Sequence, residues 1–283
     1  MKSARVGIVG AGQLGRMLAL AGYPLGIECV LLDRSDDSPG AQVAPLRRAA
    51  LDDGPAIAAL AADVDVVTLE IENVPVDALQ AAARVGPVFP PPDAVRAAQD
   101  RLAEKRLFGE LGIPTAPFVA VTGRDDLARA SGLGCPLVLK SRRLGYDGRG
   151  QLIVRSPAEL ERAFEDLGAV PCIAEQWIGF ERELSLIAVQ GADRERVYYP
   201  LADNVHSDGI LRRSTAPYDD AALWREARRA LDALLDRLDY RGVLTVEFFL
   251  AGGTLIANEM APRVHNSGHW TIEGAETSQF ENH

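Results

Sequence analysis

Apolar and polar stretches alternate along the first hundred residues and predict strands that alternate with helices. The short apolar runs Val6–Val9, Glu28–Asp33 and Asp65–Glu72 are typical of buried strands. The segments Gln13–Ala21 and Pro55–Ala62 between them are predicted as helices. Strands that alternate with helices form parallel sheets with right-handed crossovers. The first part of the chain is therefore predicted to be an α/β domain.

A proline cluster separates this part from the rest of the chain. Four prolines fall within residues 87–92, which is typical of a boundary. A single helix is predicted over Asp93–Leu111, and Gly112 marks its end. We therefore expect an N-terminal α/β domain on the substrate side, residues 1–92, and a second domain, residues 93–283.

Strands dominate the second domain. Strands predicted at Leu137–Lys140 and Gln151–Arg155 flank a glycine-rich loop. The capping-box pattern Ser156–Glu159 then predicts the start of a helix. Strands recur over Cys172–Leu201, and a long amphipathic helix is predicted over Asp219–Leu238. The pattern indicates an α+β domain.

Two glutamates lie on a predicted hairpin near the end of the sequence. Glu247 and Glu259 are both odd-numbered and about equally far from the turn Ala251–Gly253, so they are expected to be cross-strand neighbours. Opposed like charges destabilise a sheet, and a hard cation such as Mg²⁺ removes that cost. The alternative is an exposed edge with two solvated glutamates. The aperiodic polar run Pro262–His269 that follows favours a metal site.

Composition excludes several classes of function. The net charge is −10, with 40 acidic and 30 basic residues, which argues against a broad nucleic-acid-binding face. No apolar run approaches the ~18 residues of a membrane span, and the sequence begins with a strand instead of a signal peptide. Cys29, Cys135 and Cys172 are far apart and are interpreted as buried reduced thiols. We expect a cytoplasmic protein with small-molecule partners, no nucleic acid and no membrane.

The segment Gly10–Gly15, Gly-Ala-Gly-Gln-Leu-Gly, resembles a dinucleotide-binding fingerprint. It lies between a predicted strand and helix, and Asp33 ends the next strand. The glycines indicate a tight turn and a helix N-terminus that can face an anion. The domain is too short for a six-stranded Rossmann sheet, so an NAD(P)-dependent oxidoreductase is kept only as an alternative.

A basic, glycine-rich loop follows Lys140. This lysine ends an apolar strand, so its ammonium group can reach into a cleft. The loop Ser141–Gln151 holds three glycines and three arginines and can fold over a triphosphate. We expect its arginines to lack partners until phosphate binds. Glu175–Ile178 can present backbone groups to an adenine edge, with Glu183 in reach of a ribose.

Other catalytic patterns are weaker. His265 and His269 are four residues apart and suggest zinc, but Pro262 and Gly268 argue against the helix that such a motif needs. No serine lies in a Gly-x-Ser-x-Gly elbow, and no cysteine is adjacent to a histidine in the sequence. The glycine-rich polar setting of Tyr146 favours a site role over a packing role.

Four motifs together resemble a single family. They are Gly10–Leu18, Gly145–Gln151, Asp208–Arg212 and Asn258–Trp270. Over essentially the whole chain they resemble the 5-(carboxyamino)imidazole ribonucleotide synthases, ATP-grasp ligases of purine biosynthesis. The resemblance implies an ATP-grasp fold, with an N-terminal parallel-sheet (pre-ATP-grasp) domain and an α+β lid and nucleotide-binding domain. The lid is expected at about residues 115–178.

The resemblance also implies a reaction. The family joins bicarbonate to 5-aminoimidazole ribonucleotide with ATP, through carboxyphosphate, and releases ADP and phosphate. Mg²⁺ and a homodimer are expected, and so is the absence from this chain of the family's small C-terminal domain. The alternatives are a sister ATP-grasp ligase, such as formate-dependent glycinamide ribonucleotide transformylase, and a nucleotide-binding regulatory module that never turns over.

The site residues follow from the same resemblance. ATP is assigned to Arg101, Lys140, Gly145, Tyr146, Asp147, Gly148, Arg149, Gly150, Gln151, Glu175, Gln176, Trp177, Ile178, Glu183, His206, Asn258 and Glu259. The metal is assigned to Glu247 and Glu259. The imidazole nucleotide and bicarbonate are assigned to Gln13, Leu14, Glu70, Arg263 and Asn266, and catalysis to Arg263, Tyr146 and Asp147. The planar fork of arginine suits the oxygens of carboxyphosphate.

We predict that the chain binds ATP with Mg²⁺ and does not bind NADH. Lys140, the basic loop and the glutamate pair form a more specific combination than the isolated glycine fingerprint. Calorimetric titration with each nucleotide checks this prediction. Tight binding of NADH without binding of ATP would contradict it.

Overall fold

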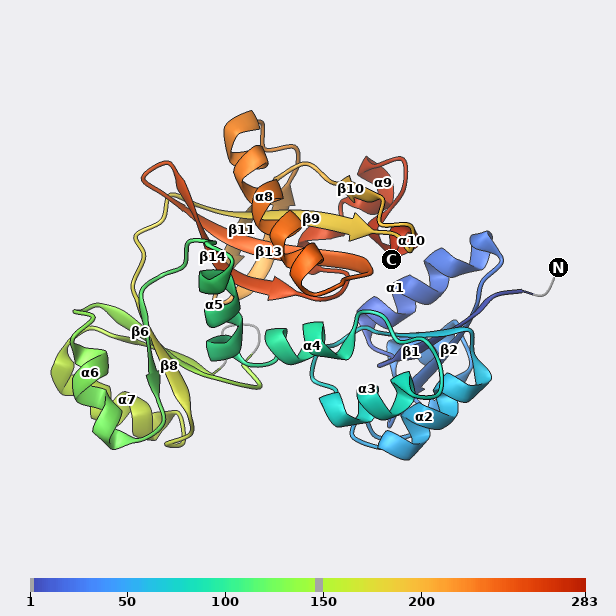
Figure 1. The fold of residues 1–283 in the computed structure, drawn as a ribbon, viewed down its shortest axis with the longest axis horizontal. Helices are drawn as coiled ribbons and strands as arrows, with labels where there is room; N and C mark the ends of the chain where they lie inside the picture. The colour runs from blue at the N-terminus through green and yellow to red at the C-terminus, as the bar shows by residue number, and fades with distance from the viewer. Residues whose placement is uncertain (1–2, 146–149) are drawn as a thin grey trace.

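The N-terminal part of the computed structural model, which describes residues 3–145 and 150–283, is a four-stranded parallel sheet covered by helices (Figure 1). The strand order is β3-β2-β1-β4. The elements are β1 (Arg5–Val9), α1 (Gln13–Gly22), β2 (Glu28–Asp33), β3 (Leu46–Arg48), α2 (Gly54–Asp63), β4 (Val66–Leu69) and α3 (Val76–Ala83). The predicted parallel α/β arrangement is confirmed, whereas β3 and α3 were not predicted.

Two helices connect this sheet to the rest of the molecule. They are α4 (Pro92–Ala98) and α5 (Arg101–Glu110), so the single helix predicted over Asp93–Leu111 is wrong. Asp100 has an extended backbone, with φ −128° and ψ 108°, and its carboxylate accepts hydrogen bonds from the N–H groups of Leu102 and Ala103. The break is therefore an N-cap that starts a new helix.

A smaller antiparallel sheet forms a separate lobe, with α6 and α7 packed on it (Figure 1). Its strand order is β5-β8-β6-β7. The elements are β5 (Phe118–Val121), α6 (Leu127–Ser131), β6 (Leu137–Ser141), β7 (Gln151–Val154), α7 (Leu160–Asp166) and β8 (Cys172–Gln176). The capping box predicted at Ser156 does not form, because the carboxylate of Glu159 accepts from the N–H of Arg155 and the hydroxyl of Ser156 instead.

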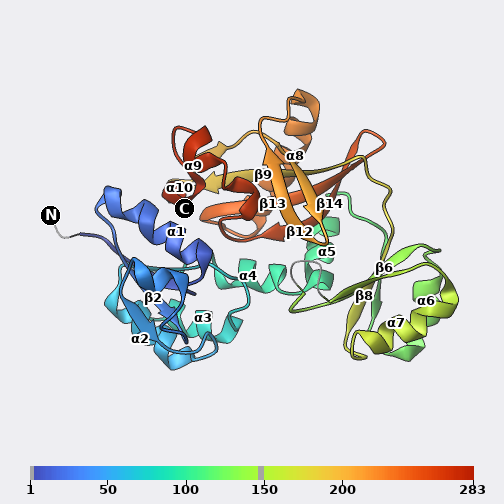
Figure 2. The ribbon, with the colours of Figure 1, turned by 180° about the vertical axis from the view of Figure 1, so that it is seen from behind.

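The largest sheet lies in the second half of the chain, with α8 packed against it (Figure 2). The order is β12-β11-β9-β13-β14, and β10 pairs with β9. The elements are β9 (Arg182–Gln190), β10 (Arg196–Tyr198), β11 (Ala202–Ser207), β12 (Ile210–Thr215), α8 (Ala221–Arg237), β13 (Gly242–Ala251), β14 (Thr254–Ala261), α9 (Thr271–Gly274) and α10 (Gln279–Asn282). No helix of the described residues is long and apolar enough to cross a membrane.

The β13–β14 hairpin has the predicted register. Gly252 and Gly253 form its turn with φ values of 56° and 77°, a conformation that favours glycine. Glu247 pairs directly with Glu259, although the register shifts by one residue between Glu247 and Phe248. The prediction of two cross-strand glutamates is therefore confirmed.

The N-terminal sheet and the large sheet are joined near the C-terminal end of the described chain. Helices α1 and α10 lie side by side in both views (Figure 1, Figure 2). The imidazole of His283 lies between the two sheets: its Nε2 is 2.7 Å from Oγ1 of Thr68 on β4, and its Nδ1 accepts from the N–H of Val243 on β13 at 3.1 Å. Burial lowers the pKa of His283 to about 4. This contact fixes the first sheet beside the large one.

The glycine-rich loop before α1 holds a carboxylate of the protein itself. Glu70, the first residue after β4, accepts hydrogen bonds from the N–H groups of Gly12 and Gly15. A Cβ atom at Gly12 would lie only 2.7 Å from Glu70 Oε1, so a larger residue there would displace this carboxylate. Asp33 accepts from the N–H of Ala11 at 3.1 Å. The loop therefore binds Glu70 in place of a dinucleotide phosphate.

The three cysteines differ in burial. Cys172 is buried, and burial raises the pKa of its thiol to about 11. Cys29 is half-buried and Cys135 is exposed, so the prediction of three buried thiols holds only for Cys172. Cys135 lies just before β6, where the chain enters the sheet from the surface.

We predict that Glu70→Ala lowers the free energy of unfolding by about 1–3 kcal/mol, because two N–H groups at the start of α1 lose their partner. Asp77→Ala is the matched control, since Asp77 is an exposed acid in the first turn of α3. This control is expected to change stability by less than about 1 kcal/mol. Urea denaturation measures both variants, and an equal loss in both would contradict a capping role for Glu70.

Candidate active site

A cavity of about 1140 Å³ lies between the three sheets. Its lining includes Gln13 and Glu72 from the N-terminal part, Lys140 from the smaller sheet, and Glu247 from the large sheet. Predicted site residues that line it are Gln13, Arg101, Lys140, Gly145, Gln151, Glu175, Gln176, Trp177, Ile178, Glu183, His206, Glu247, Asn258, Glu259, Arg263 and Asn266. Residues predicted from every part of the chain thus meet in one place.

Several predicted residues do not line this cavity. Leu14 packs in the apolar cluster between α1 and the large sheet, and Glu70 is buried at the N-terminus of α1. The carbonyl of Gly150 accepts from the N–H of Ser141 at 2.8 Å. The predictions for Tyr146, Asp147, Gly148 and Arg149 lie outside the described residues.

A buried lysine–glutamate pair forms the wall on the side of the smaller sheet. Lys140 Nζ donates to Glu175 Oε2 at 2.9 Å, and Lys105 Nζ lies 3.6 Å from the same oxygen. Burial alone would raise the pKa of Glu175, but Lys140 and then Lys105 outweigh burial and lower it. Lys105 also donates to the carbonyl of Ala257 on β14 at 3.1 Å. These contacts link the smaller sheet to the large sheet through α5.

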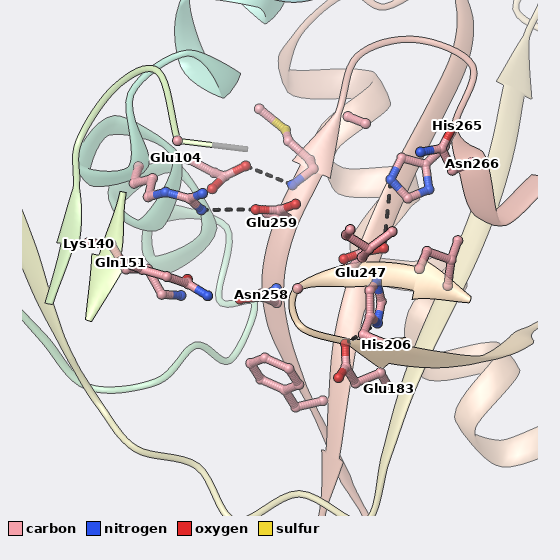
Figure 3. Close-up of a pocket in the computed structure, with 18 of the residues that line it drawn as sticks. Glu104, Lys140, Gln151, Glu183, His206, Glu247, Asn258, Glu259, His265 and Asn266 are labelled. Carbon is pink, nitrogen blue, oxygen red and sulfur yellow. Dashed lines mark hydrogen bonds and ion pairs between the residues drawn. The ribbon is translucent and has the colours of Figure 1, made fainter. Parts of the chain in front are cut away.

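Glu247 and Glu259 lie at the centre of the cavity (Figure 3). Burial, and then the charge of Glu259, raise the pKa of Glu247 to about 8. Burial also opposes ionisation of Glu259, but Arg101 donates to Glu259 Oε2 at 2.9 Å and holds its pKa at about 2. One carboxylate thus has an arginine partner, whereas the other faces a like charge.

The glutamate pair fits a hard divalent cation. Carboxylate oxygens are preferred ligands of Mg²⁺, which usually takes one or two of them together with phosphate oxygens. A cation beside Glu247 would favour its ionised form. Among the described residues, no group of three or more His, Cys, Asp or Glu side chains could hold a metal ion. A bound cation would therefore share ligands with a bound molecule.

Two close side-chain contacts flank the glutamates. His206 Nδ1 lies 2.8 Å from Glu183 Oε2, and this contact raises the pKa of His206. On the other side, Nη2 of Arg263 donates to Glu72 Oε1 at 3.1 Å, and Nε donates to Oε2. Burial opposes ionisation of Glu72, but the Arg263 charge outweighs it and lowers its pKa. The cavity is therefore lined by both cations and carboxylates.

The chain matches two protein-family models along its length: the ribonucleotide synthetase preATP-grasp domain over residues 1–99 and the ATP-grasp domain over residues 106–280. An N5-carboxyaminoimidazole ribonucleotide synthase of Pseudomonas aeruginosa is 49% identical over 280 residues, which cover 99% of this chain and 78% of the relative. The chain belongs to the N5-carboxyaminoimidazole ribonucleotide synthase family.

Solved structures of this synthase family have the same fold. The N5-carboxyaminoimidazole ribonucleotide synthetase of Thermus thermophilus matches with a TM-score of 0.93 and 48% identity, over 98% of this chain and 76% of that chain. An Aspergillus clavatus synthase, solved in complex with ADP and 5-aminoimidazole ribonucleotide, matches with a TM-score of 0.92 and 35% identity, over 99% of this chain and 75% of that chain. The predicted family and the ATP-grasp fold are confirmed.

In this member of the synthase family, Arg142 already has a partner. Its Nε and Nη2 donate to the two carboxylate oxygens of Asp100 at 2.9 and 2.6 Å, and Arg143 Nε lies 3.4 Å from the same carboxylate. The expectation that the loop arginines lack partners before phosphate binds is therefore wrong for Arg142 and Arg143. Asp100 is buried at the start of α5, and a buried carboxylate requires a compensating charge.

Glu72, Glu104 and Lys105, which lie in or near the cavity, are among the charged residues that were not predicted. Glu72 follows the parallel strand β4, and its position beyond the carboxyl end of that strand was an available signal. Glu104 and Lys105 are almost fully buried on α5, and Glu104 Oε1 accepts from the N–H of Met260 at 2.7 Å. On a helix of ordinary polar composition, nothing in the sequence distinguishes them from exposed residues.

We predict that Asp100→Asn lowers the free energy of unfolding by about 1–3 kcal/mol near neutral pH, because Arg142 loses its charged partner. Asn still caps α5, so Asp100→Ala should cost about 1 kcal/mol more. Burial opposes ionisation of Asp100, but the Arg142 hydrogen bonds lower its folded pKa. This stabilisation is therefore present above the unfolded pKa of about 3.9 and is lost as pH falls through the folded pKa.

Denaturant titrations of the parent and Asp100→Asn from pH 6 to pH 3 measure this effect. The difference between the two proteins should shrink in the acid range. If the difference in unfolding free energy is the same at pH 6 and at pH 3, the ionised Asp100–Arg142 pair does not contribute to stability.

Proposed function

We propose that this chain joins bicarbonate to 5-aminoimidazole ribonucleotide with hydrolysis of ATP to ADP and phosphate, through carboxyphosphate, in purine biosynthesis. The observation that carries the proposal is that one cavity is lined by Lys140, the Glu247–Glu259 pair and Arg263. Phosphoryl transfer depends on positioning and on neutralising charge, and these residues supply both. The Aspergillus clavatus relative, solved with ADP and the aminoimidazole nucleotide, supports the substrate.

The basic groups on the smaller-sheet side hold the ATP phosphates. Lys140 reaches the cavity from the end of β6, and Glu175 holds its ammonium group in place. Residues 175–178 then lie where the strand β8 ends and can present backbone groups to the adenine. Glu183 and His206 face the ribose from the large sheet. Asn258, next to Glu259, orients the phosphates.

Glu247 and Glu259 would hold Mg²⁺, which would neutralise the charge of the phosphate oxygens. Arg101 keeps Glu259 ionised and thus ready to bind a cation. Arg263 presents its guanidinium toward the carboxyphosphate oxygens, and Glu72 fixes the plane of that guanidinium. The amine of the imidazole nucleotide attacks the carboxyl carbon. Phosphate leaves with the electrons of the broken C–O bond and takes up the proton that the amine loses.

The remaining parts of the proposal concern the wider protein. We infer that residues 1–92 serve the imidazole nucleotide, that residues 93–283 serve ATP, and that the segment at about 115–178 acts as a lid. We also infer a cytoplasmic homodimer. Light scattering of the purified protein tests the homodimer, and a monomeric mass would refute it.

ADP release measured with a coupled assay tests the reaction. ADP should form when ATP, Mg²⁺, bicarbonate and 5-aminoimidazole ribonucleotide are all present. The rate of ADP formation should fall when either bicarbonate or 5-aminoimidazole ribonucleotide is left out. ADP formation that depends on formate and glycinamide ribonucleotide would instead identify the sister ligase. No ADP formation under either condition would favour a regulatory module.

We predict that Glu247→Gln and Glu259→Gln each lower kcat by at least about 100-fold, because a metal ligand supplies several kcal/mol of transition-state stabilisation. Glu226→Gln is the matched control, since Glu226 on α8 accepts from the N–H of Leu255 at 3.2 Å and does not line the cavity. This control should keep parental kcat. Parental activity in the two cavity variants would show that these carboxylates bind no essential cation.

A further inference from the structure

A run of buried polar side chains leads from β12 to the imidazole of His265. Ser214 Oγ donates to Asn204 Oδ1 at 2.7 Å, and Asn204 Nδ2 donates to Ser185 Oγ at 2.9 Å. Ser185 Oγ then donates to Ser267 Oγ at 2.9 Å, which lies 2.8 Å from Nδ1 of His265. We call Ser214, Asn204, Ser185 and Ser267 the serine–asparagine chain. Its three inner members are at most 4% exposed.

The directions of these hydrogen bonds determine which ring nitrogen of His265 carries the proton. Ser267 already accepts from Ser185, so its own hydroxyl proton is available for Nδ1 of His265. The backbone N–H of Ser267 also points to Nδ1 at 3.3 Å, and a backbone N–H can only donate. Nδ1 therefore accepts, and the proton of the neutral ring lies on Nε2.

The backbone of His265 is held on both sides by a single buried side chain. Gln279 Oε1 accepts from the N–H of His265 at 3.0 Å, and Gln279 Nε2 donates to its carbonyl at 2.7 Å. Gln279 is fully buried. With its backbone fixed and Nδ1 occupied, the ring turns Nε2 toward Glu247, whose Oε1 is 3.7 Å away (Figure 3).

We propose that the serine–asparagine chain is a set of positioning residues that holds His265 as a neutral imidazole with its Nε2–H turned into the cavity. In this state His265 donates a hydrogen bond to an oxygen in the cavity and presents no lone pair there. It therefore does not serve as the base that removes the proton from the attacking amine. The importance of this donor for turnover rests on the proposed function, whereas the protonation of the ring does not.

The ring can be observed directly in the ligand-free protein. The sequence contains four histidines, so the imidazole nitrogens of uniformly ¹⁵N-labelled protein give a small set of NMR signals. His265→Gln identifies which of them belong to His265. The expected pattern is an unprotonated Nδ1 and a protonated Nε2, and a protonated Nδ1 would overturn the proposal. This measurement needs no substrate, so its outcome is separate from that of the proposed reaction.

The positioning role is tested by interrupting the serine–asparagine chain at Ser185. Ser185→Ala should lower kcat about tenfold, as expected when a histidine loses the partners that orient it, and leave KM for ATP within about twofold. Ser185→Thr keeps the hydroxyl and should recover most of the activity. Thr245→Val is the matched control, because Thr245 is buried on the neighbouring β13 and its hydroxyl has no partner among the described residues. This control should leave kcat unchanged.

A second variant of the serine–asparagine chain, at a less buried residue, distinguishes a loss of positioning from a folding defect. Ser214→Ala removes the outermost, half-buried hydroxyl and leaves the inner members in place, so a loss of about threefold in kcat is expected. The ¹⁵N spectrum of each variant should show a fraction of His265 with the proton moved to Nδ1. If both variants keep parental kcat and the parental imidazole signals, the serine–asparagine chain does not position His265.

Discussion

The carboxylates of Glu247 and Glu259 face each other across the β13–β14 hairpin. Their repulsion costs free energy, and the charged residues around them reduce that cost. The pairing of Glu247 with Glu259 follows from the register of β13 and β14, which is fixed by apolar residues on the opposite face of the strands. Like charges in this position destabilise a sheet unless something of opposite charge lies between or beside them. Arg101 satisfies one of the two. The ionised form of the other, Glu247, is favoured when a cation binds in the cavity.

The positive groups in and near the cavity come from distant parts of the chain. Arg101 and Lys105 project from α5, Lys140 from the smaller sheet, and Arg263 from the segment after β14. Each is itself paired with a carboxylate, so the cavity wall is a network and not a single ion pair. Such a network loses more than one contact when any member is removed, since its partners are left buried and unpaired. Its geometry is therefore strongly coupled.

The sequence predicted those parts of the site that depend on local periodicity. The alternation of strand residues was sufficient to place Glu247 opposite Glu259, even though a bulge lies beside them. The same alternation was not sufficient to place Glu70 and Glu72. The strand was expected to continue to Glu72, but β4 ends at Leu69, and beyond it Glu70 binds the start of α1 whereas Glu72 lines the cavity. Where a short strand ends is decided by tertiary contacts that periodicity does not report.

The occupied helix N-terminus at Gly12 has a consequence for how the two halves of the protein respond to nucleotide. Glu70 satisfies the N–H groups of α1 from within the same domain, so the start of this helix needs no ligand to complete it. Ligand concentration shifts only those equilibria in which the ligand takes part. Glu247 is the opposite case, since burial and the charge of Glu259 raise its pKa. The protein therefore combines a helix start whose hydrogen bonds are complete without a ligand with a carboxylate whose ionised form is favoured by a bound cation.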